Sequence, residues 1–417
     1  MRTSFMTLVI LTALTVSACI PTNRDRRVES NSPFDPYNQT IITDGQTFKT
    51  MQGDGQHLLH GTPQNQPYQQ VAKGKIALLL PLTGKHQKIG QALLQSSQLA
   101  LFDINQSGIE LIPLDTKGTA QGASAAVEQA AQSGAKIILG PLFADAVSAA
   151  GQAAKRHNLT VIGFTTDWNK AGGNIFTMGI LPFDQGARLA QYAATKNKKR
   201  VAILSPNTKY SNAVISSFEQ SARAYGITVT HKIAIGKTTA AIKQNLSALN
   251  AQATQFDAIL IPTGNPTLSL IANALNDVGL NASTKTWLGT GVWDDDTIKR
   301  NAAMENAVFA APTPALRYNF ERSYQSLYGA KPPRLASLSY DATALAITLL
   351  SQNRDIQGQA ILNPNGFSGI DGIFRFQSNG LTQRGLAIHR ISNSGRSMIV
   401  DQAPNSFLTS RGDFASR

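Results

Sequence analysis

Few residues of this chain have the types and the spacing that enzyme chemistry requires. The sequence contains no HExxH zinc motif, no G-x-S-x-G nucleophile turn, no Walker loop for phosphates and no CxxC pair. His57 and His60 have metal-like spacing, but no third ligand accompanies them. The adjacent Asp294, Asp295 and Asp296 fit a helix start, with Asp294 as the cap and its neighbours in the first turn. We therefore expect no catalytic residue, no metal site and no cofactor.

Cys19 has the clearest covalent role, and it is the only cysteine in the chain. A basic start and an apolar stretch over residues 5–16 precede it, which is the layout of an export signal; the stretch is shorter than the about 20 residues of a membrane span. Val16-Ser17-Ala18-Cys19 resembles the bacterial lipobox, in which the cysteine is lipidated and becomes the mature N-terminus. We therefore expect a lipoprotein signal peptide over residues 1–18 and a membrane anchor at Cys19; an ordinary signal peptide is the alternative. Ile20 stands where an aspartate would favour the inner membrane, so the expected location is the outer membrane, facing the periplasm.

The composition allows a large core and argues against nucleic acid as a partner. Hydrophobic residues make up 42% of the 417 residues and charged residues 15%, and the net charge is +13. A basic balance suits nucleic acid, anionic lipid or another acidic polymer. The one dense basic run, over residues 196–200, precedes a candidate strand and fits the solvated end of a helix. Since no nucleic-acid-binding motif accompanies it, we expect no nucleic-acid partner.

Strands that are buried on both faces would position any ligand-binding loops. Residues 75–80 are almost entirely apolar and end at a proline, which cannot donate to a strand ladder. A helix is expected over residues 90–104, because apolar residues recur there at helical spacing. Ligands of open parallel sheets bind at the carboxyl ends of the strands, which is where Thr83, Gly84 and Ile89 would lie.

The alternation of strand and helix repeats along the chain and predicts an α/β fold. Residues 75–178 and 185–289 each contain a series of strands and helices, the pattern of a doubly wound sheet with right-handed crossovers. Two helices are expected over residues 315–328 and 337–350. Residues 372–377 and 386–392 fit alternating strands, joined by the turn signal Ser378-Asn379-Gly380. We therefore expect two doubly wound, Rossmann-like lobes linked by hinge crossovers.

The expected domain boundaries follow from these patterns. Residues 19–73 are rich in Asn, Gln, Pro, Thr and Gly without a sustained period, and are expected to form a flexible polar tether. The first lobe is expected to combine residues 74–181 with 312–365, and the second lobe residues 182–311 with 366–396. Residues 397–417 are expected to form a loose C-terminal tail.

Several stretches carry a family resemblance. KIALLLPLTG…IGQALLQSSQLALFDIN, with GAKIILGPLF after a helix, resembles the type I periplasmic-binding-protein fold, and within it the leucine/branched-chain-amino-acid-binding group. The ending GFSGIDGIFRFQSNGLTQRGLAIHRIS resembles that group's terminal strand pair. The phrases LLLPLTG, LALFD, ILGPLF and SGIDGIFRF are most similar to the lipoprotein activators of penicillin-binding proteins (the LpoA type), which stimulate peptidoglycan synthases by contact. Well-known activators carry a helical-repeat domain ahead of this fold, whereas only the expected tether precedes it in this sequence.

The resemblance implies a ligand cleft, in which amino-acid-binding members hold a zwitterion with hydroxyls, backbone groups, an aromatic wall and an acidic partner. Thr165 and Thr166 match the hydroxyl-bearing loop, and Tyr210 matches a tyrosine that starts a second-lobe helix. The remaining positions depart from the pattern: they are Ala144, Asp145 and Ala146 in place of the serine-rich turn, Ile89 in place of the aromatic, and Gly291 in place of the acid, with Asp294 close by. Residues also expected near the cleft are Phe143, Thr263, Gly264, Asn265 and Trp293.

These departures decide what the resemblance implies about function. Each lost serine removes a hydrogen bond to a charged group, worth roughly 1.5–3 kcal/mol, so free leucine-like ligands are not expected. The cleft is then either vestigial or the site of an unidentified small polar molecule. The leading expectation is a lipid-anchored binding or scaffold protein that activates a penicillin-binding protein. The alternative is the solute-binding lipoprotein of an ABC importer for amino acids or amides, and a ligand sensor that signals to a partner would combine the two.

Overall fold

The computed structural model describes residues 42–43, 46–47, 74–236, 238–354, 356 and 360–407. The expected signal peptide, Cys19, His57 and His60 lie outside the described residues, as does the end of the expected tail. Within the expected tether, β1 (Ile42–Thr43) pairs antiparallel with β2 (Gln46–Thr47). The α/β fold begins at β3.

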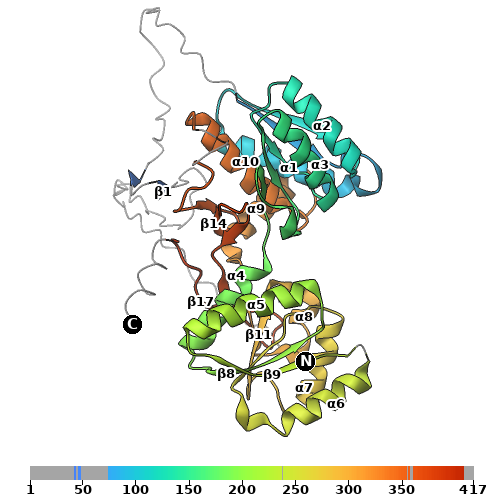
Figure 1. Ribbon diagram of the computed structural model, residues 1–417, viewed down its shortest axis with the longest axis vertical. Coiled ribbons are helices and arrows are strands. Elements are labelled where there is room, and N and C mark those ends of the chain that lie inside the picture. Colours follow the sequence, from blue (N-terminus) through green and yellow to red (C-terminus); the bar gives the residue numbers. More distant parts are fainter. Residues whose placement is uncertain are drawn as a thin grey trace, which may run out of the picture. The chain divides into compact units, whose positions relative to one another are not determined.

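The first sheet, coloured from blue to green in Figure 1, has five parallel strands in the order β4-β3-β5-β6-β7. They are β3 (Gly74–Leu80), β4 (Ile109–Asp115), β5 (Ile137–Leu139), β6 (Thr160–Gly163) and β7 (Ile175–Thr177). Alternate side chains of β3 enter two different cores. Ile76, Leu78 and Leu80 pack with α10 (Ala336–Ser351), while Ala77 and Leu79 pack with α2 (Ala120–Gln132) and α3 (Ala144–Arg156). The expectation that this strand is buried on both faces is confirmed.

Helix α1 (Gln87–Ile104) lies against α10. Buried hydroxyl groups join the two helices: the Oγ atoms of Ser97 and Ser339 are 2.8 Å apart, and Thr343 Oγ1 donates to Ser97 Oγ. Each hydroxyl therefore finds a partner in a position where an unpaired one would be costly.

The second sheet has seven strands in the order β17-β16-β12-β11-β10-β8-β9, of which β8 to β12 run parallel and β16 and β17 antiparallel. They are β8 (Arg200–Ser205), β9 (Thr228–Ala234), β10 (Ala258–Leu260), β11 (Thr286–Thr290), β12 (Val308–Ala311), β16 (Ala387–Ile391) and β17 (Ser397–Asp401). One face packs with α4 (Pro182–Thr195) and α5 (Lys209–Ala224), and the other with α6 (Thr239–Asn250) and α7 (Thr267–Asp277). The expected fold class, two doubly wound lobes, is confirmed.

The C-terminal strands differ from the expected pair. The turn Ser378-Asn379-Gly380 joins β14 (Gly372–Phe376) to β15 (Thr382–Arg384), and together with β13 (Phe367–Gly369) these form a separate antiparallel sheet. β16 instead pairs with β12 in the second sheet. Alternating polarity predicts a half-buried strand but does not say which strand it pairs with, and that is why the expected pairing was wrong.

Two of the expected domain boundaries also differ from what the structure shows. Phe367, Phe374 and Phe376 pack in the core of the first lobe, although residues 366–396 were expected in the second lobe. Only β16 and the residues after it join the second sheet. β17 pairs with β16, so the expected loose tail is wrong for Ser397–Asp401. An edge strand of mixed polarity has little hydrophobic signal, which explains why the sequence did not indicate it.

The chain passes between the two lobes three times: between β7 and α4, between β12 and α9 (Pro314–Tyr328), and between β15 and β16. We call these connections the crossovers. His389 of β16 contacts the second crossover, where its Nε2 lies 3.1 Å from the carbonyl oxygen of Pro312. The crossovers are therefore joined to one another by contacts as well as by the chain.

Candidate functional site

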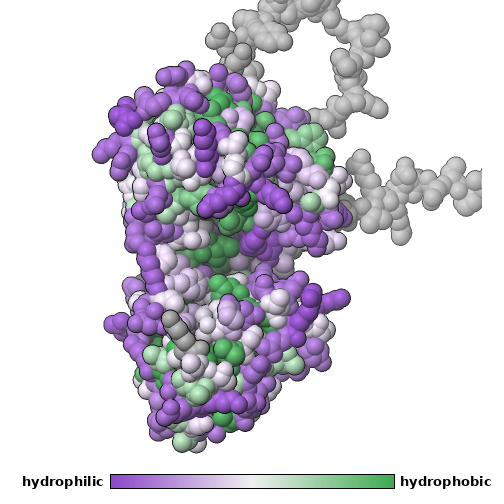
Figure 2. Space-filling view, turned by 90° about the vertical axis from the view of Figure 1, so that its right-hand side faces the viewer, coloured by the Kyte–Doolittle hydropathy of each residue, from purple (hydrophilic) through white to green (hydrophobic). Residues whose placement is uncertain are grey.

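A cavity of about 570 Å³ is lined by residues of both lobes. The lining residues are Thr166, Asp167, Trp168, Ile180, Pro182, Gln185, Lys209, Tyr210, Gly291, Val292, Asp294, Ala311, Pro312 and Arg334. Figure 2 shows a recess at mid-height of one face of the molecule, where apolar residues gather between hydrophilic ones. The volume falls in the range of about 300–1,000 Å³ that is typical of small-molecule pockets.

The carboxyl ends of parallel strands bring most of this lining together. Thr166, Asp167 and Trp168 follow β6, Gly291 and Val292 follow β11, and Ala311 ends β12. Loops at this edge of an α/β sheet are where ligands bind, because there the strands end and the chain turns into helices. Tyr210 belongs to the first turn of α5, which Thr208 caps by accepting a hydrogen bond from the backbone N–H of Ser211.

Four of the residues named from the sequence line this cavity: Thr166, Tyr210, Gly291 and Asp294. Thr263, Gly264 and Asn265 line a smaller pocket of about 370 Å³ beside it, and Tyr210 and Val292 border both. The other candidates line neither of these pockets; they are Thr83, Gly84, Ile89, Phe143, Ala144, Asp145, Thr165 and Trp293.

Three of those other candidates have structural partners instead. Thr83 donates its hydroxyl to Asp115 at 2.6 Å, and the hydroxyl of the buried Thr165 accepts from the backbone N–H of Asp167. Trp293 is fully buried, and its indole N–H donates to the carbonyl oxygen of Thr263 at 2.8 Å. These side chains shape the loops rather than face the cavity.

Asp294 does not cap a helix, contrary to the expectation. Asp295 caps the short α8 (Asp296–Lys299), accepting from the backbone N–H groups of Thr297 and Ile298. Asp294 instead forms ion pairs with Lys299 at 3.0 Å and with Arg317 at 2.9 Å. Burial acts to raise the pKa of Asp294, but these two cations hold the pKa below its usual value. The carboxylate is therefore ionised and already paired.

A second ion pair connects the lobes at the cavity. The ammonium group of Lys209, on α5, lies 3.0 Å from the carboxylate of Asp167, which follows β6. It also lies 4.9 Å from the centre of the Trp168 ring, within the distance of a cation–π contact. The hydrogen bond from Lys209 lowers the pKa of Asp167. Sequence reasoning missed Trp168 and Lys209, although an aromatic residue two positions after a hydroxyl-bearing loop is a usable signal.

The polar groups that surround Tyr210 are also paired with one another. The Tyr210 hydroxyl lies 2.9 Å from Thr290 Oγ1 and 3.3 Å from Gln185 Oε1, and Gln185 Oε1 accepts from the backbone N–H of Gly291 at 2.7 Å. Burial raises the pKa of Tyr210, so the phenol is protonated at neutral pH. This cluster fixes the second-lobe wall and leaves little free hydrogen-bonding capacity for a ligand.

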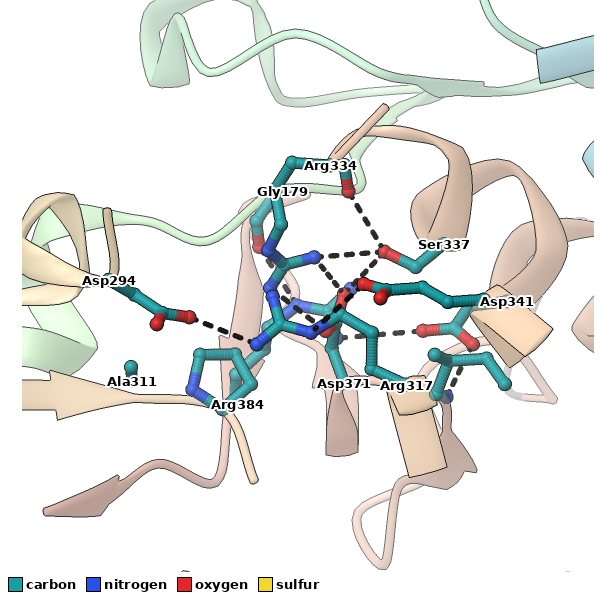
Figure 3. A network of polar contacts seen from close by, with 12 residues as sticks. Gly179, Asp294, Ala311, Arg317, Arg334, Ser337, Asp341, Asp371 and Arg384 are labelled. Carbon is teal, nitrogen blue, oxygen red and sulfur yellow. Dashed lines mark hydrogen bonds and ion pairs between the residues drawn. The ribbon is translucent and has the colours of Figure 1, made fainter. Parts of the chain in front are cut away.

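Arg334, which is partly exposed at the cavity, pairs with charges buried behind it, and we call the whole set the buried charge network (Figure 3). Its members are Arg334, Asp341, Asp371 and Arg384, together with Asp184. Arg334 Nη1 donates to Asp371 Oδ2 at 2.9 Å, and Nη2 forms an ion pair with Oδ1 at 2.9 Å. Ser337 donates its hydroxyl to the same carboxylate. Burial acts to raise the pKa of Asp371, but Arg334 outweighs it and the pKa is lowered.

Arg384 joins this network to the crossovers. Its backbone N–H donates to Asp184 Oδ2 at 2.9 Å, and its Nε donates to the carbonyl oxygen of Gly179 at 3.0 Å. Its Nη1 lies 3.7 Å from Asp341 Oδ2. Burial raises the pKa of Asp184 and that of Asp341 to about 7 each. The site is thus a mostly apolar cavity backed by paired charges, and the part of the chain that the structure describes contains no cluster of three metal-binding side chains.

Known proteins share this fold. The family model described as "Periplasmic binding protein" matches residues 73–395. The chain belongs to the periplasmic binding protein family. Similar solved structures include a putative branched-chain amino acid ABC transporter from Rhodospirillum rubrum, with a TM-score of 0.69 and 17% identity, covering 78% of this chain and 99% of that one. At these identities the likeness shows the fold alone.

Two further proteins are similar to this chain. The LpoA (YraM) C-domain from Haemophilus influenzae, described as a regulator of PBP1A, has a TM-score of 0.61 and 18% identity, covering 78% of this chain and 100% of that domain. An uncharacterised protein of Rickettsia prowazekii (strain Madrid E), RP748, is 24% identical over 215 residues, which is 50% of this chain and 57% of the relative. The matched segment thus spans little more than half of that relative. Among the described residues, no helix has both the length and the apolarity to cross a bilayer.

Proposed function

We propose that this protein is a lipid-anchored binding protein of the bacterial cell envelope that regulates peptidoglycan synthesis by activating a penicillin-binding protein. The ion pairs of Asp294 carry the proposal. A bound amino acid needs an acidic group for its ammonium, but Lys299 and Arg317 already hold Asp294 at 3.0 and 2.9 Å. Displacing either cation would leave a partly buried charge unpaired, at high cost. Contact with a partner protein therefore fits the chain better than capture of a free amino acid.

Two further observations support a regulator. The fold is shared with a domain described as a regulator of PBP1A, and the lipobox-like Val16-Ser17-Ala18-Cys19 would anchor the chain to a membrane, with the outer membrane as the proposed site. Lipid attachment at Cys19 would hold the protein at the outer membrane, where it faces the periplasm. Reach across the periplasm would then fall to the residues between Cys19 and β3.

The test is a reconstituted synthesis assay. The full chain, purified in detergent, is added to each penicillin-binding protein of the same organism, and glycan polymerisation and peptide cross-linking are measured on a lipid-linked substrate. When the chain is present in equimolar amount, we expect one of the synthases to show a several-fold increase in the rate of either glycan polymerisation or peptide cross-linking. The variant Cys19→Ser should still activate the synthase in detergent, because the lipid anchor places the protein at the membrane and is not needed for contact with the synthase. No change in rate with any of the synthases would refute the proposal.

The alternative is the solute-binding lipoprotein of an ABC importer. The cavity itself favours it, since about 570 Å³ lined from both lobes is an ordinary size for a small-molecule pocket. Calorimetric titration of the full chain with leucine, isoleucine and short aliphatic amides distinguishes the two. Saturable micromolar binding of any of them would favour uptake over regulation.

A further inference from the structure

Arg334 is the charged residue of the cavity lining that has an unused pair of donors. A guanidinium group has five N–H bonds in one plane. Arg334 Nη1 donates to Asp371 Oδ2 and to Ser337 Oγ, and Nη2 forms an ion pair with Asp371 Oδ1 that lacks hydrogen-bond geometry. The N–H bond on Nε and the N–H bond of Nη2 that lies beside it remain. They point the same way along one edge of the group, and no partner for Nε occurs among the described residues.

This free edge is accessible and rigid. Arg334 lines the cavity, and 38% of its side chain is exposed, whereas the Asp371 side chain behind it is fully buried. The carboxylate of Asp371 fixes the orientation of the guanidinium from behind, so little freedom remains to be lost when a ligand binds to the front. Paired N–H donors along one edge match the two oxygens of a carboxylate or the oxygens of a phosphate group.

The other charged groups of the lining are already committed. Lys209 pairs with Asp167, and Asp294 pairs with Lys299 and Arg317. A ligand ammonium therefore meets no free carboxylate in this lining, while a ligand anion meets the open edge of Arg334. The charges of the lining therefore favour a negatively charged ligand over a zwitterion.

The rest of the lining indicates that the uncharged part of the ligand is apolar. Seven side chains are apolar or aromatic; they are Trp168, Ile180, Pro182, Tyr210, Val292, Ala311 and Pro312. Val292 is one of the few large hydrophobic residues that remain exposed, at 41%. Apolar surface of this kind gains free energy when a hydrophobic group covers it, in proportion to the area buried.

We infer that the cavity binds a small organic anion, a carboxylate or a phosphate monoester with an apolar body, whose anionic group pairs with the free edge of Arg334. The inference rests on the proposed function in taking this cavity as the regulator's ligand site, and it adds the ligand's chemical class. Its apolar body lies against Trp168 and Val292, and its anionic group points toward the buried charge network. Thr165 takes no part in holding the anion.

Calorimetric titration of the full chain, followed in parallel by tryptophan fluorescence, tests the inference with four probes of one shape. They are 3-phenylpropionate, its neutral amide, the zwitterion phenylalanine and phenyl phosphate. We expect saturable binding of at least one of the two anions, and binding at least tenfold weaker for the amide and for phenylalanine. The carboxylate and phosphate arms show which anion the edge prefers.

Three variants assign the binding to Arg334. Arg334→Gln would leave Asp371 buried without its partner, so the double variant R334Q/D371N keeps the network balanced. We expect the double variant to weaken anion binding roughly 10- to 100-fold, as expected for loss of hydrogen bonds to a charged group. D371N alone retains the guanidinium and should bind the anion as tightly as the wild type or tighter. R322Q, which removes an exposed arginine on α9, should change nothing.

The results that would overturn the inference are equally specific. They are absence of saturable binding for both anions, amide or phenylalanine binding that equals anion binding, or an unchanged affinity in R334Q/D371N. An equal loss in D371N and in the double variant would show a merely structural role and would also overturn it. None of these results bears on whether a synthase is activated in the reconstituted assay, so failure of the inference and failure of the proposed function are distinguishable.

Discussion

Asp184 makes the stability of this fold depend on pH near neutrality. It lies in the first turn of α4, just after the first crossover, and accepts a hydrogen bond from the backbone N–H of Arg384. Burial raises its pKa from 3.8 to about 7. Between about pH 4 and pH 7 the folded protein thus keeps a proton on Asp184 that the unfolded chain has released, so folding stability falls as the pH rises through this window. Asp184→Asn keeps the acceptor and cannot ionise, and should remove this part of the pH dependence.

The size of the effect follows from the shift. One pKa unit corresponds to about 1.4 kcal/mol, so a rise of about three units sets a ceiling of about 4 kcal/mol above pH 7. Asp184 as a residue is only partly shielded from solvent, and water screens part of this cost. We therefore expect D184N to gain about 2 kcal/mol relative to the wild type between pH 5 and pH 8.

Urea unfolding of the full chain at several pH values, followed by circular dichroism and tryptophan fluorescence, measures this gain. Burial also raises the pKa of Asp341 to about 7 and lowers the pKa of His389. Both are present in wild type and variant, so they cancel in the difference. D145N is the matched control, because that side chain is 92% exposed, and its profile should follow the wild type. A difference between D184N and wild type that stays constant from pH 5 to pH 8 would refute the reasoning.

Two further substitutions test the packing and the ion pair at the site. Gly289→Ala should destabilise the fold by about 1–3 kcal/mol in urea unfolding, because the added methyl group would lie 2.2 Å from ring atoms of the buried Trp293. G264A is its control, with its nearest neighbour at 3.5 Å and a negligible expected cost; equal losses in both would contradict the packing argument. Lys209→Met should cost less than about 1 kcal/mol, since 60% of the Lys209 side chain is exposed, but should change the fluorescence of Trp168. A loss above about 2 kcal/mol would show that the ion pair holds the lobes together.

An element of the fold could be predicted from the sequence wherever its own residues show a clear hydrophobic pattern. The strand β3 is such a case, since a run of apolar residues ending at a proline fits burial on both faces, and both faces are buried. Helix α1 is another, predicted over residues 90–104 and found at Gln87–Ile104. β12 was missed because four residues ahead of a proline contain too little pattern to separate a strand from a loop. β17, which follows β16 after five residues, was missed because a run of five residues is too short to show the alternation of a strand.

The site could be predicted only in part, for a related reason. Thr166, Tyr210 and Gly291 were found because ligand loops follow strands, and a strand can be located from sequence. Arg334 follows no strand. It lies in the turn between α9 and α10, and its orientation depends on Asp371, which is 37 residues further along the chain. Residue spacing along the sequence does not reveal such a contact, so Arg334 could not be identified as a site residue before the fold was known.

The buried charge network has a role other than stability. Buried ion pairs contribute little net free energy compared with apolar residues of the same volume, so stability alone does not explain Arg384 and Asp341 in a core that is otherwise hydrophobic. What they do provide is a fixed arrangement of the crossovers, because Arg384 hydrogen-bonds to Gly179 and Asp184 and forms an ion pair with Asp341.

Asp371 connects that arrangement to the cavity. It holds Arg334 directly, and the charge of Arg384 also lowers its pKa, so one carboxylate interacts with the cavity wall and with the residue that joins the crossovers. An anion on the free edge of Arg334 adds negative charge to this network and weakens the hold of the guanidinium on Asp371. We therefore expect ligand binding and the geometry of the crossovers to be coupled through the charge of Asp371, and the same D371N variant tests this coupling.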